Sequence, residues 1–350
     1  MMTLECGVVA NIIQEDDTVQ ILYVDLNGLV EKAINYKDIY GRIEIGQKVW
    51  LNTTAVRLKL GSGGFHFVLW HDAMHAVKMY GDGHIMKLPY TPWQFGCLSV
   101  EEDDSAYHSA FTRECTLDGM PVIICELHSM LAPTAAVLKY IGFDTLAYIM
   151  TDRACLPIAF SNTVKELRRK ELLDYTITVG NAFGGDYEAV NLYTALITAH
   201  RIARADAAIV AIGPGIIGTG TMYGFSTLEQ GHYIDDVNAL SGRAIFMPRI
   251  SFSDPRSRHI GISHHSLTAL SLAAHTQAEV YIPILPKKQM RMVISQIEGG
   301  NLLNKHRWRF RDGSCIGAIM ERYGLHVTTM GRSYNDDPAF FKVAGALKNI

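Results

Sequence analysis

The residue types best suited to binding a small molecule gather in two segments of the chain. The first, residues 213–221, follows an apolar run and consists largely of glycine and threonine: Gly213, Gly215, Gly218, Thr219, Gly220 and Thr221. Because glycine places no side chain over the backbone, the amides of such a loop can surround an anion. The alternative is a tight structural loop that needs glycine for its backbone conformation or for close packing.

The three leading glycines of this loop also match G-x-G-x-x-G, the dinucleotide-binding pattern. That pattern needs a helix to open at the glycines, whereas a capping box places the next helix start near Ser226. The next strand is followed by Arg249, where an acidic residue would bind the ribose, and arginine suits only a phosphorylated ribose. An NADP-type dinucleotide site is therefore a further alternative.

The second segment, residues 249–265, concentrates basic and imidazole side chains in a chain of formal net charge -3. Its members are Arg249, Arg256, Arg258, His259, His264 and His265. Guanidinium groups bind phosphate or carboxylate through paired hydrogen bonds. His264 and His265 follow the expected helix cap Ser263, where the helix dipole favours neutral imidazoles that donate a hydrogen bond or bind a metal. The alternative is a surface network in which the arginines pair with acidic residues such as Asp254.

Other polar residues follow the predicted strands and offer catalytic or metal-binding groups. The candidates for a catalytic role are His264, His265, His128, Asp152 and Asp186. Imidazole and carboxylate groups also bind metal ions, and the candidates for that role are His128, Asp152, Asp186, Asp254 and His264. These residues do not form a complete catalytic constellation in the sequence, so it identifies neither a reaction nor a cofactor.

Strands that alternate with helices must position these loops. Apolar runs predict strands at residues 121–127, 146–150, 175–179, 207–212, 244–247 and 280–285. Helices are expected between them, including one capped by Asp186. This order predicts an α/β fold with a mostly parallel, Rossmann-like sheet and helices on both faces. The loops that follow the strands then share one edge of the sheet, so the two segments should face each other.

The N-terminal part has a different pattern, with strands and no helices. Short β-rich runs at residues 7–13, 19–24, 48–51 and 65–69 predict a small all-β, barrel-like module over residues 1–70. Residues 71–117 contain an acidic run and little regular periodicity, and we interpret them as a connecting segment. The α/β domain is expected to occupy residues 118–350.

Composition limits the classes of partner and the compartment. The chain has 350 residues, of which 48% are hydrophobic and 19% charged, which predicts a large core and a folded protein. The slightly negative net charge predicts no general attraction to nucleic acid or to an anionic membrane. No secretory signal and no spanning apolar run are evident, so we expect a cytoplasmic protein, and a homo-oligomer stays open. The six cysteines form no Cys-x-x-Cys pair; Cys125 and Cys155 are expected to be reduced and mostly buried.

Five stretches carry a resemblance to a known family: residues 84–92, 148–152, 180–186, 213–231 and 249–265. They resemble the family of bacterial proteins that share the domain of unknown function 3866, and the resemblance extends over nearly the whole chain. It implies an intracellular bacterial protein, but no activity and no catalytic residue.

Two functional hypotheses remain. The first is an enzyme or former enzyme that binds a phosphorylated or otherwise anionic small molecule at the carboxyl edge of the sheet. The second is a non-catalytic ligand sensor or assembly protein that docks a partner through its N-terminal β module. A pocket beside the glycine loop would favour the first, and an exposed apolar patch on the β module would favour the second.

Overall fold

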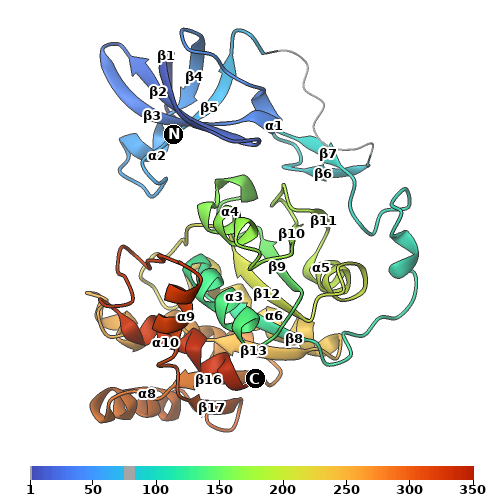
Figure 1. Ribbon diagram of the computed structural model, residues 1–350, viewed down its shortest axis with the longest axis vertical. Coiled ribbons are helices and arrows are strands. Elements are labelled where there is room, and N and C mark those ends of the chain that lie inside the picture. The colour runs from blue at the N-terminus through green and yellow to red at the C-terminus, as the bar shows by residue number, and fades with distance from the viewer. Residues whose placement is uncertain (1, 75–82) are drawn as a thin grey trace. The chain divides into compact units, whose positions relative to one another are not determined.

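The computed structural model (Figure 1) describes residues 2–74 and 83–350 of the chain. Two compact units are distinguished by their internal contacts. One contains the described part of Met1–Asp82 together with Phe95–Cys97, and the other contains Gly83–Gln94 and Leu98–Ile350. Within the described residues, no helix is both long and apolar enough to cross a membrane.

The first unit is a closed five-stranded barrel, which confirms the predicted β module. Its strands, in barrel order, are β1 (Leu4–Glu15), β2 (Val19–Leu26), β3 (Leu29–Tyr36), β5 (His66–His71) and β4 (Lys48–Asn52). The sequence analysis did not predict β3, whose exposed half contains Glu31 and Lys32 among apolar residues. Two single-turn helices, α1 (Lys37–Tyr40) and α2 (Thr54–Arg57), connect the strands.

The second unit contains an eight-stranded sheet in which every pair of neighbours is parallel. In sheet order the strands are β11 (Tyr187–Ala189), β10 (Tyr175–Val179), β9 (Leu146–Thr151), β12 (Ala207–Ile212), β8 (Pro121–Cys125), β13 (Arg243–Met247), β16 (Glu279–Pro283) and β17 (Arg307–Arg311). The central strands are almost continuously apolar because helices cover both faces. The predicted α/β, Rossmann-like fold is confirmed.

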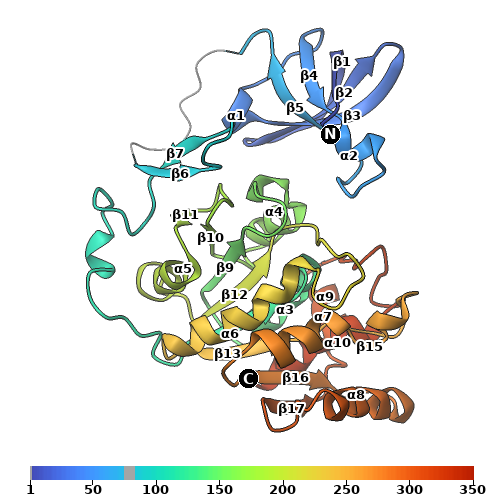
Figure 2. The same cartoon turned by 180° about the vertical axis from the view of Figure 1, so that it is seen from behind.

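Figures 1 and 2 show which helices cover each face of this sheet. One face carries α3 (Leu131–Tyr140), α4 (Asn162–Arg169), α9 (Ile316–Arg322) and α10 (Pro338–Gly345). The other carries α5 (Leu192–Ile197), α6 (Gln230–Ala239) and α7 (His264–Thr268). The remaining helix, α8 (Lys287–Gly299), packs against the short strand β15 (Gly261–Ile262), which pairs with β14 (Ile250–Ser251).

On each side of β8 the chain diverges to opposite faces of the sheet. The chain leaves β8 toward α3 on one face, whereas it leaves both neighbouring strands, β12 and β13, toward α6 and α7 on the other. Loops that diverge to opposite faces leave space beyond the carboxyl ends of the strands, where ligands bind in open α/β sheets. A ligand-binding site is therefore expected at the end of β8.

Two local expectations, both about helix caps, are wrong. Asp186 caps no helix, because residues 187–189 form β11 and Asn191 caps the helix that follows. Ser226 makes no cap hydrogen bond; it opens a 3₁₀ turn, Ser226–Glu229, before α6 begins at Gln230. Cys125 is buried and Cys155 is mostly buried, as expected, and all six cysteines are free thiols. Residues 71–117 hold two short strands, β6 (Ile85–Lys87) and β7 (Phe95–Cys97), in addition to loops.

Candidate functional site at the end of β8

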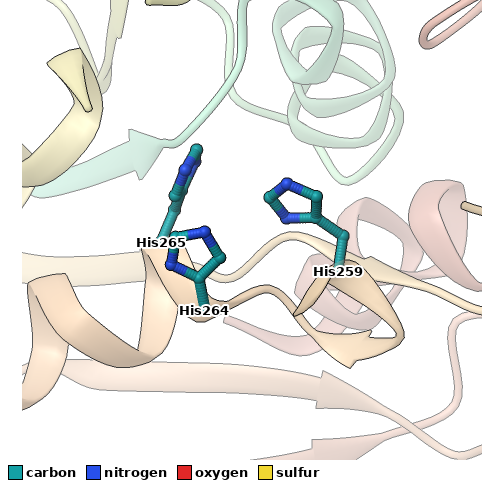
Figure 3. A group of neighbouring side chains, drawn as sticks. All are labelled: His259, His264 and His265. Carbon is teal, nitrogen blue, oxygen red and sulfur yellow. The ribbon is translucent and has the colours of Figure 1, made fainter. Parts of the chain in front are cut away.

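Three histidines from the second segment form a compact cluster (Figure 3). One ring nitrogen from each of His259, His264 and His265 lies within 4.8 Å of the others. His259 and His265 are buried and His264 is half-buried. Ser263 caps α7, as expected, by accepting a hydrogen bond of 3.2 Å from the His265 amide, so His264 and His265 are the first two residues of this helix.

Two imidazoles of this cluster, those of His259 and His264, are held in the neutral state. Burial, reinforced by the charges of Arg249 and Arg256, lowers the pKa of His259 to about 3. Burial and the neighbouring His265 also lower the pKa of His264. Neutral imidazole has one nitrogen with a free lone pair, so each ring can accept a hydrogen bond or bind a metal.

Glu126, the first residue after β8, lies directly beside the cluster and is only 1% exposed. Its carboxylate accepts a hydrogen bond from Ser266 and lies 3.5 Å from Nδ1 of His265. Burial alone would raise the pKa of this carboxyl, but His265 and the positive charge of Arg249 outweigh it and lower the pKa. A buried, ionised carboxylate therefore faces the histidines.

The arginines of the same segment are paired, with one exception. Arg249 is 2% exposed and donates a hydrogen bond of 2.6 Å to Asp254, and Arg256 donates two of 2.9 Å to the same carboxylate. Arg332 lies 3.5 Å from Asp254 as well. The ion-pair alternative thus describes Arg249 and Arg256. Because Arg249 is buried in this pair, it does not offer its charge to the ribose phosphate of a dinucleotide.

Arg258 is the exception and lies against the glycine loop. Its side chain is exposed, and no described residue pairs with its guanidinium. A Cβ atom built on Gly220 would lie 3.8 Å from that guanidinium carbon, and one built on Gly218 would lie 3.6 Å from the ring of His265. The two segments therefore face each other, as the parallel topology predicted.

Hydrogen bonds between nearby residues fix the conformation of the glycine loop. The hydroxyls of Thr219 and Thr221 lie 2.8 Å apart, and Thr221 accepts a hydrogen bond of 3.1 Å from the amide of Gly224. Ser226 accepts a hydrogen bond of 3.1 Å from the amide of Ile217, which explains why it serves the loop and not a helix cap. Gly215 and Gly220 adopt positive φ angles of 102° and 78°, which glycine adopts readily.

A cavity of about 430 Å³ occupies the crevice between the ends of β8 and β12. Its wall combines residues that follow β8, residues of the glycine loop, the start of α4 and residues 326–330: Leu127, His128, Ser129, Asn162, Thr163, Glu166, Pro214, Gly215, Ile216, His326, Val327, Thr328, Thr329 and Met330. Burial lowers the pKa of His128 to about 4. Its Nε2 lies 2.7 Å from the hydroxyl of Ser161, so this imidazole is neutral and fixed in orientation.

Asp152 and Asp186 lie elsewhere on the sheet. Asp152 follows β9 and accepts a hydrogen bond of 3.1 Å from the amide of Asn181. Asp186 accepts bonds of 2.8 and 3.0 Å from Thr176 and pairs with Arg168 at 3.0 Å. Of the five residues considered as metal ligands, only His264 belongs to a group with ligand spacing among the described residues, and its partners there are His259 and His265.

Glu126 and Lys87 were not among the predicted site residues. The sequence signal for Glu126 was its position as an acidic residue near the end of a predicted strand. Lys87 is 1% exposed and donates hydrogen bonds of 2.6 and 3.0 Å to the carbonyls of Gly180 and Ala182, while Glu188 lies 3.1 Å away. Lys87 belongs to one of the stretches that carry the family resemblance, but no periodicity distinguishes it.

Comparison with known proteins identifies a family. The model of a family described as protein of unknown function, DUF3866, matches residues 32–347. The chain belongs to this family. No curated protein and no solved structure matches the chain. The DUF3866 match includes both segments and the end of β8, but the description of the family assigns none of them a role.

Proposed function

We propose that this protein binds a small anionic molecule at the carboxyl edge of its parallel sheet. The observation that carries this proposal is the cavity between the ends of β8 and β12, which lies where the chain diverges to opposite faces. Its volume of about 430 Å³ is within the range of small-molecule sites. The hydroxyls of Ser129, Thr163 and Thr329 and the imidazole of His326 offer hydrogen bonds to the body of a ligand.

The anionic group of the ligand is assigned to the glycine loop and Arg258. Ile216 lines the cavity, and Gly218 follows two residues later, so their Cα atoms are at most about 7 Å apart. A molecule the size of a sugar phosphate can therefore extend from the cavity to the backbone amides of the loop. Arg258 lies beside Gly220 with an unpaired guanidinium, which suits phosphate or carboxylate.

Calorimetric titration of the full-length protein with sugar phosphates and nucleotides tests this proposal. Arg258→Ala should weaken binding roughly 10- to 100-fold, because a charge-assisted hydrogen bond is lost. Arg291→Ala removes an exposed guanidinium from α8 and serves as the control, with unchanged binding expected. Analysis of the ligand after incubation distinguishes an enzyme from a ligand sensor.

A second pair of variants tests the cavity itself. Thr163→Trp should fill part of the cavity and abolish binding, whereas Thr163→Val keeps the shape and should bind nearly as well as the wild type. The proposal fails if no compound of the panel binds the wild type. It also fails if Arg258→Ala and Thr163→Trp both bind a compound as tightly as the wild type does.

The cysteines support the expected compartment. All six are free thiols, which is typical of proteins in a reducing environment such as the cytoplasm. Burial raises the pKa of the Cys125 thiol to about 12, so this group is chemically inert at neutral pH.

Self-association through the barrel is a second candidate function. Trp50 of β4 and Trp70 of β5 are directly opposite each other and are 41% and 44% exposed. Val49 and Leu51, the strand neighbours of Trp50, point into the barrel core, and His71, next to Trp70, is buried, so both indoles lie on the outer surface. Sedimentation of the wild type and of the Trp50→Ser/Trp70→Ser double variant tests this: loss of an oligomer in the variant supports it, and a monomeric wild type excludes it.

A further inference from the structure

We propose that His259, His264 and His265 bind one divalent transition-metal ion of the zinc class. The three rings surround a shared space (Figure 3), and their centroids are 4.3 to 5.1 Å apart. Ligand nitrogens around a tetrahedral zinc ion are roughly 3.4 Å apart, as follows from Zn–N distances of about 2.0–2.1 Å. The nitrogens here lie within 4.8 Å of one another, so modest ring rotations bring them to that spacing.

The hydrogen bonds around the rings leave suitable nitrogens free. Nδ1 of His259 is bonded to the hydroxyl of Ser263 at 2.8 Å, which leaves its Nε2 for a metal. Nε2 of His264 is buried and has no hydrogen-bond partner. A buried polar atom without a partner costs free energy of desolvation, and a bound metal ion removes that cost.

The outer groups of the cluster, Ser263 and Glu126, lie at ring nitrogens that would not bind the metal, as similar groups do in protein metal sites. Metal-binding histidines usually pair their second nitrogen with a carboxylate, hydroxyl or carbonyl, which fixes the ring. Ser263 does this for His259, and Glu126 lies 3.5 Å from Nδ1 of His265, which leaves its Nε2 on the side of Gly218. The ionised Glu126 also offsets the positive charge of the nearby arginines, which would otherwise oppose a cation.

The donor set selects the class of metal. Three imidazole ligands suit zinc and its neighbours in the transition series, whereas magnesium and calcium require oxygen ligands. Three protein ligands leave one tetrahedral position open, as in catalytic zinc sites. Gly218 faces His265 without a side chain, so the loop leaves room at the cluster for water or a ligand oxygen.

Titration of the EDTA-treated, full-length protein with Zn²⁺ tests the site. We expect one ion per chain in the wild type. His264→Ala should weaken binding more than 100-fold, since loss of an outer group alone costs roughly 10- to 100-fold. His264 is half-buried, so this variant should keep its fold, which circular dichroism checks. The double variant His232→Ala/His275→Ala removes a second neighbouring pair of histidines and should bind Zn²⁺ as the wild type does.

Two further measurements test the metal site without relying on the fold of the His264→Ala variant or on binding of the proposed anion. Co²⁺ bound to the unmodified protein should give the intense visible absorption of a four-coordinate ion, and Glu126→Gln should lower Zn²⁺ affinity roughly 10- to 100-fold. A wild type that binds no Zn²⁺, or a His264→Ala variant that binds it equally well, overturns the proposal. The metal titrations are done without phosphate, and the titrations with sugar phosphates and nucleotides are done in EDTA. Metal binding and anion binding are therefore measured separately, and either proposal can fail without the other.

Discussion

The barrel and the parallel sheet place their charged groups differently. In the barrel, Arg57 bridges Glu5 and Glu31 at 2.7 and 2.6 Å, and all three side chains are partly exposed. At the end of β8 in the sheet unit, Glu126 and Arg249 are each at most 2% exposed. Surface pairs contribute little to stability, whereas buried charges are costly unless several partners hold them.

This difference supports the sites that we propose at the end of β8. Buried ionised groups and neutral histidines with lowered pKa values gather at functional sites more often than on ordinary surfaces. They gather here around β8, and among the described residues the barrel has no cluster with metal-ligand spacing. The barrel instead presents Trp50 and Trp70 to solvent, which suits contact with a macromolecule better than catalysis.

The largest predicted effect tests whether the two units are separate folding units. Phe246 in β13 and Leu22 in β2 are both fully buried. Phe246→Ala should lower the free energy of unfolding of the sheet unit by about 3–5 kcal/mol, and Leu22→Ala that of the barrel by about 2–5 kcal/mol, because each leaves a cavity. Scanning calorimetry should show two transitions, with each variant lowering only one. If both variants lower every transition equally, the units unfold together.

The sequence predicted the larger elements of the sheet because buried parallel strands are continuous apolar runs. Residues 207–212 and 175–179 were predicted with the bounds that the structure shows. The strand Leu29–Tyr36 was missed because its first half is exposed and mixes charged with apolar residues. The position of a barrel strand depends on pairing with distant strands, which local periodicity does not show.

The sequence predicted that the two segments lie side by side, but not how their side chains pair. Parallel topology was sufficient to bring Gly218 and Gly220 against the segment of His265 and Arg258. The topology did not show that Asp254 would form ion pairs with Arg249 and Arg256, because side-chain pairing depends on how a loop folds. The approach of His259 to His264 depends in turn on the short β14–β15 pair, which brings residues 250 and 262 together.

A smaller effect tests the buried charge network. Asp254→Asn keeps the shape of the side chain but leaves Arg249 buried without its counter-charge. We expect a loss of about 3 kcal/mol in the free energy of unfolding of the sheet unit, since breaking a buried ion pair leaves an uncompensated charge. Urea unfolding measures it. Asp336→Asn, at an exposed loop, is the control and should change stability by less than about 0.5 kcal/mol. If both variants lose the same free energy of unfolding, the ion pairs of Asp254 do not stabilise the fold.

The smallest effect concerns the surface charges of the barrel and appears mainly in its pH dependence. Hydrogen bonds from Arg57 lower the pKa of Glu5 from 4.5 to about 2, and Arg57 also lowers the pKa of Glu31, which contacts His66. A carboxyl whose pKa is lower in the folded state stabilises the fold above about pH 4.5, and this contribution disappears as the pH falls toward 2.

Arg57→Ala removes the cause of this shift. At pH 7 we expect a loss of about 1 kcal/mol, because the pairs are partly exposed to solvent. Between pH 4.5 and 2 the barrel transition of the variant should fall less steeply than that of the wild type, as scanning calorimetry at several pH values would show. Arg42→Ala is a matched control, since Arg42 pairs with Glu15 and is 51% exposed, and it should cost less. An unchanged pH profile in Arg57→Ala would mean that these ion pairs do not hold the barrel, and that its stability comes from its apolar core alone.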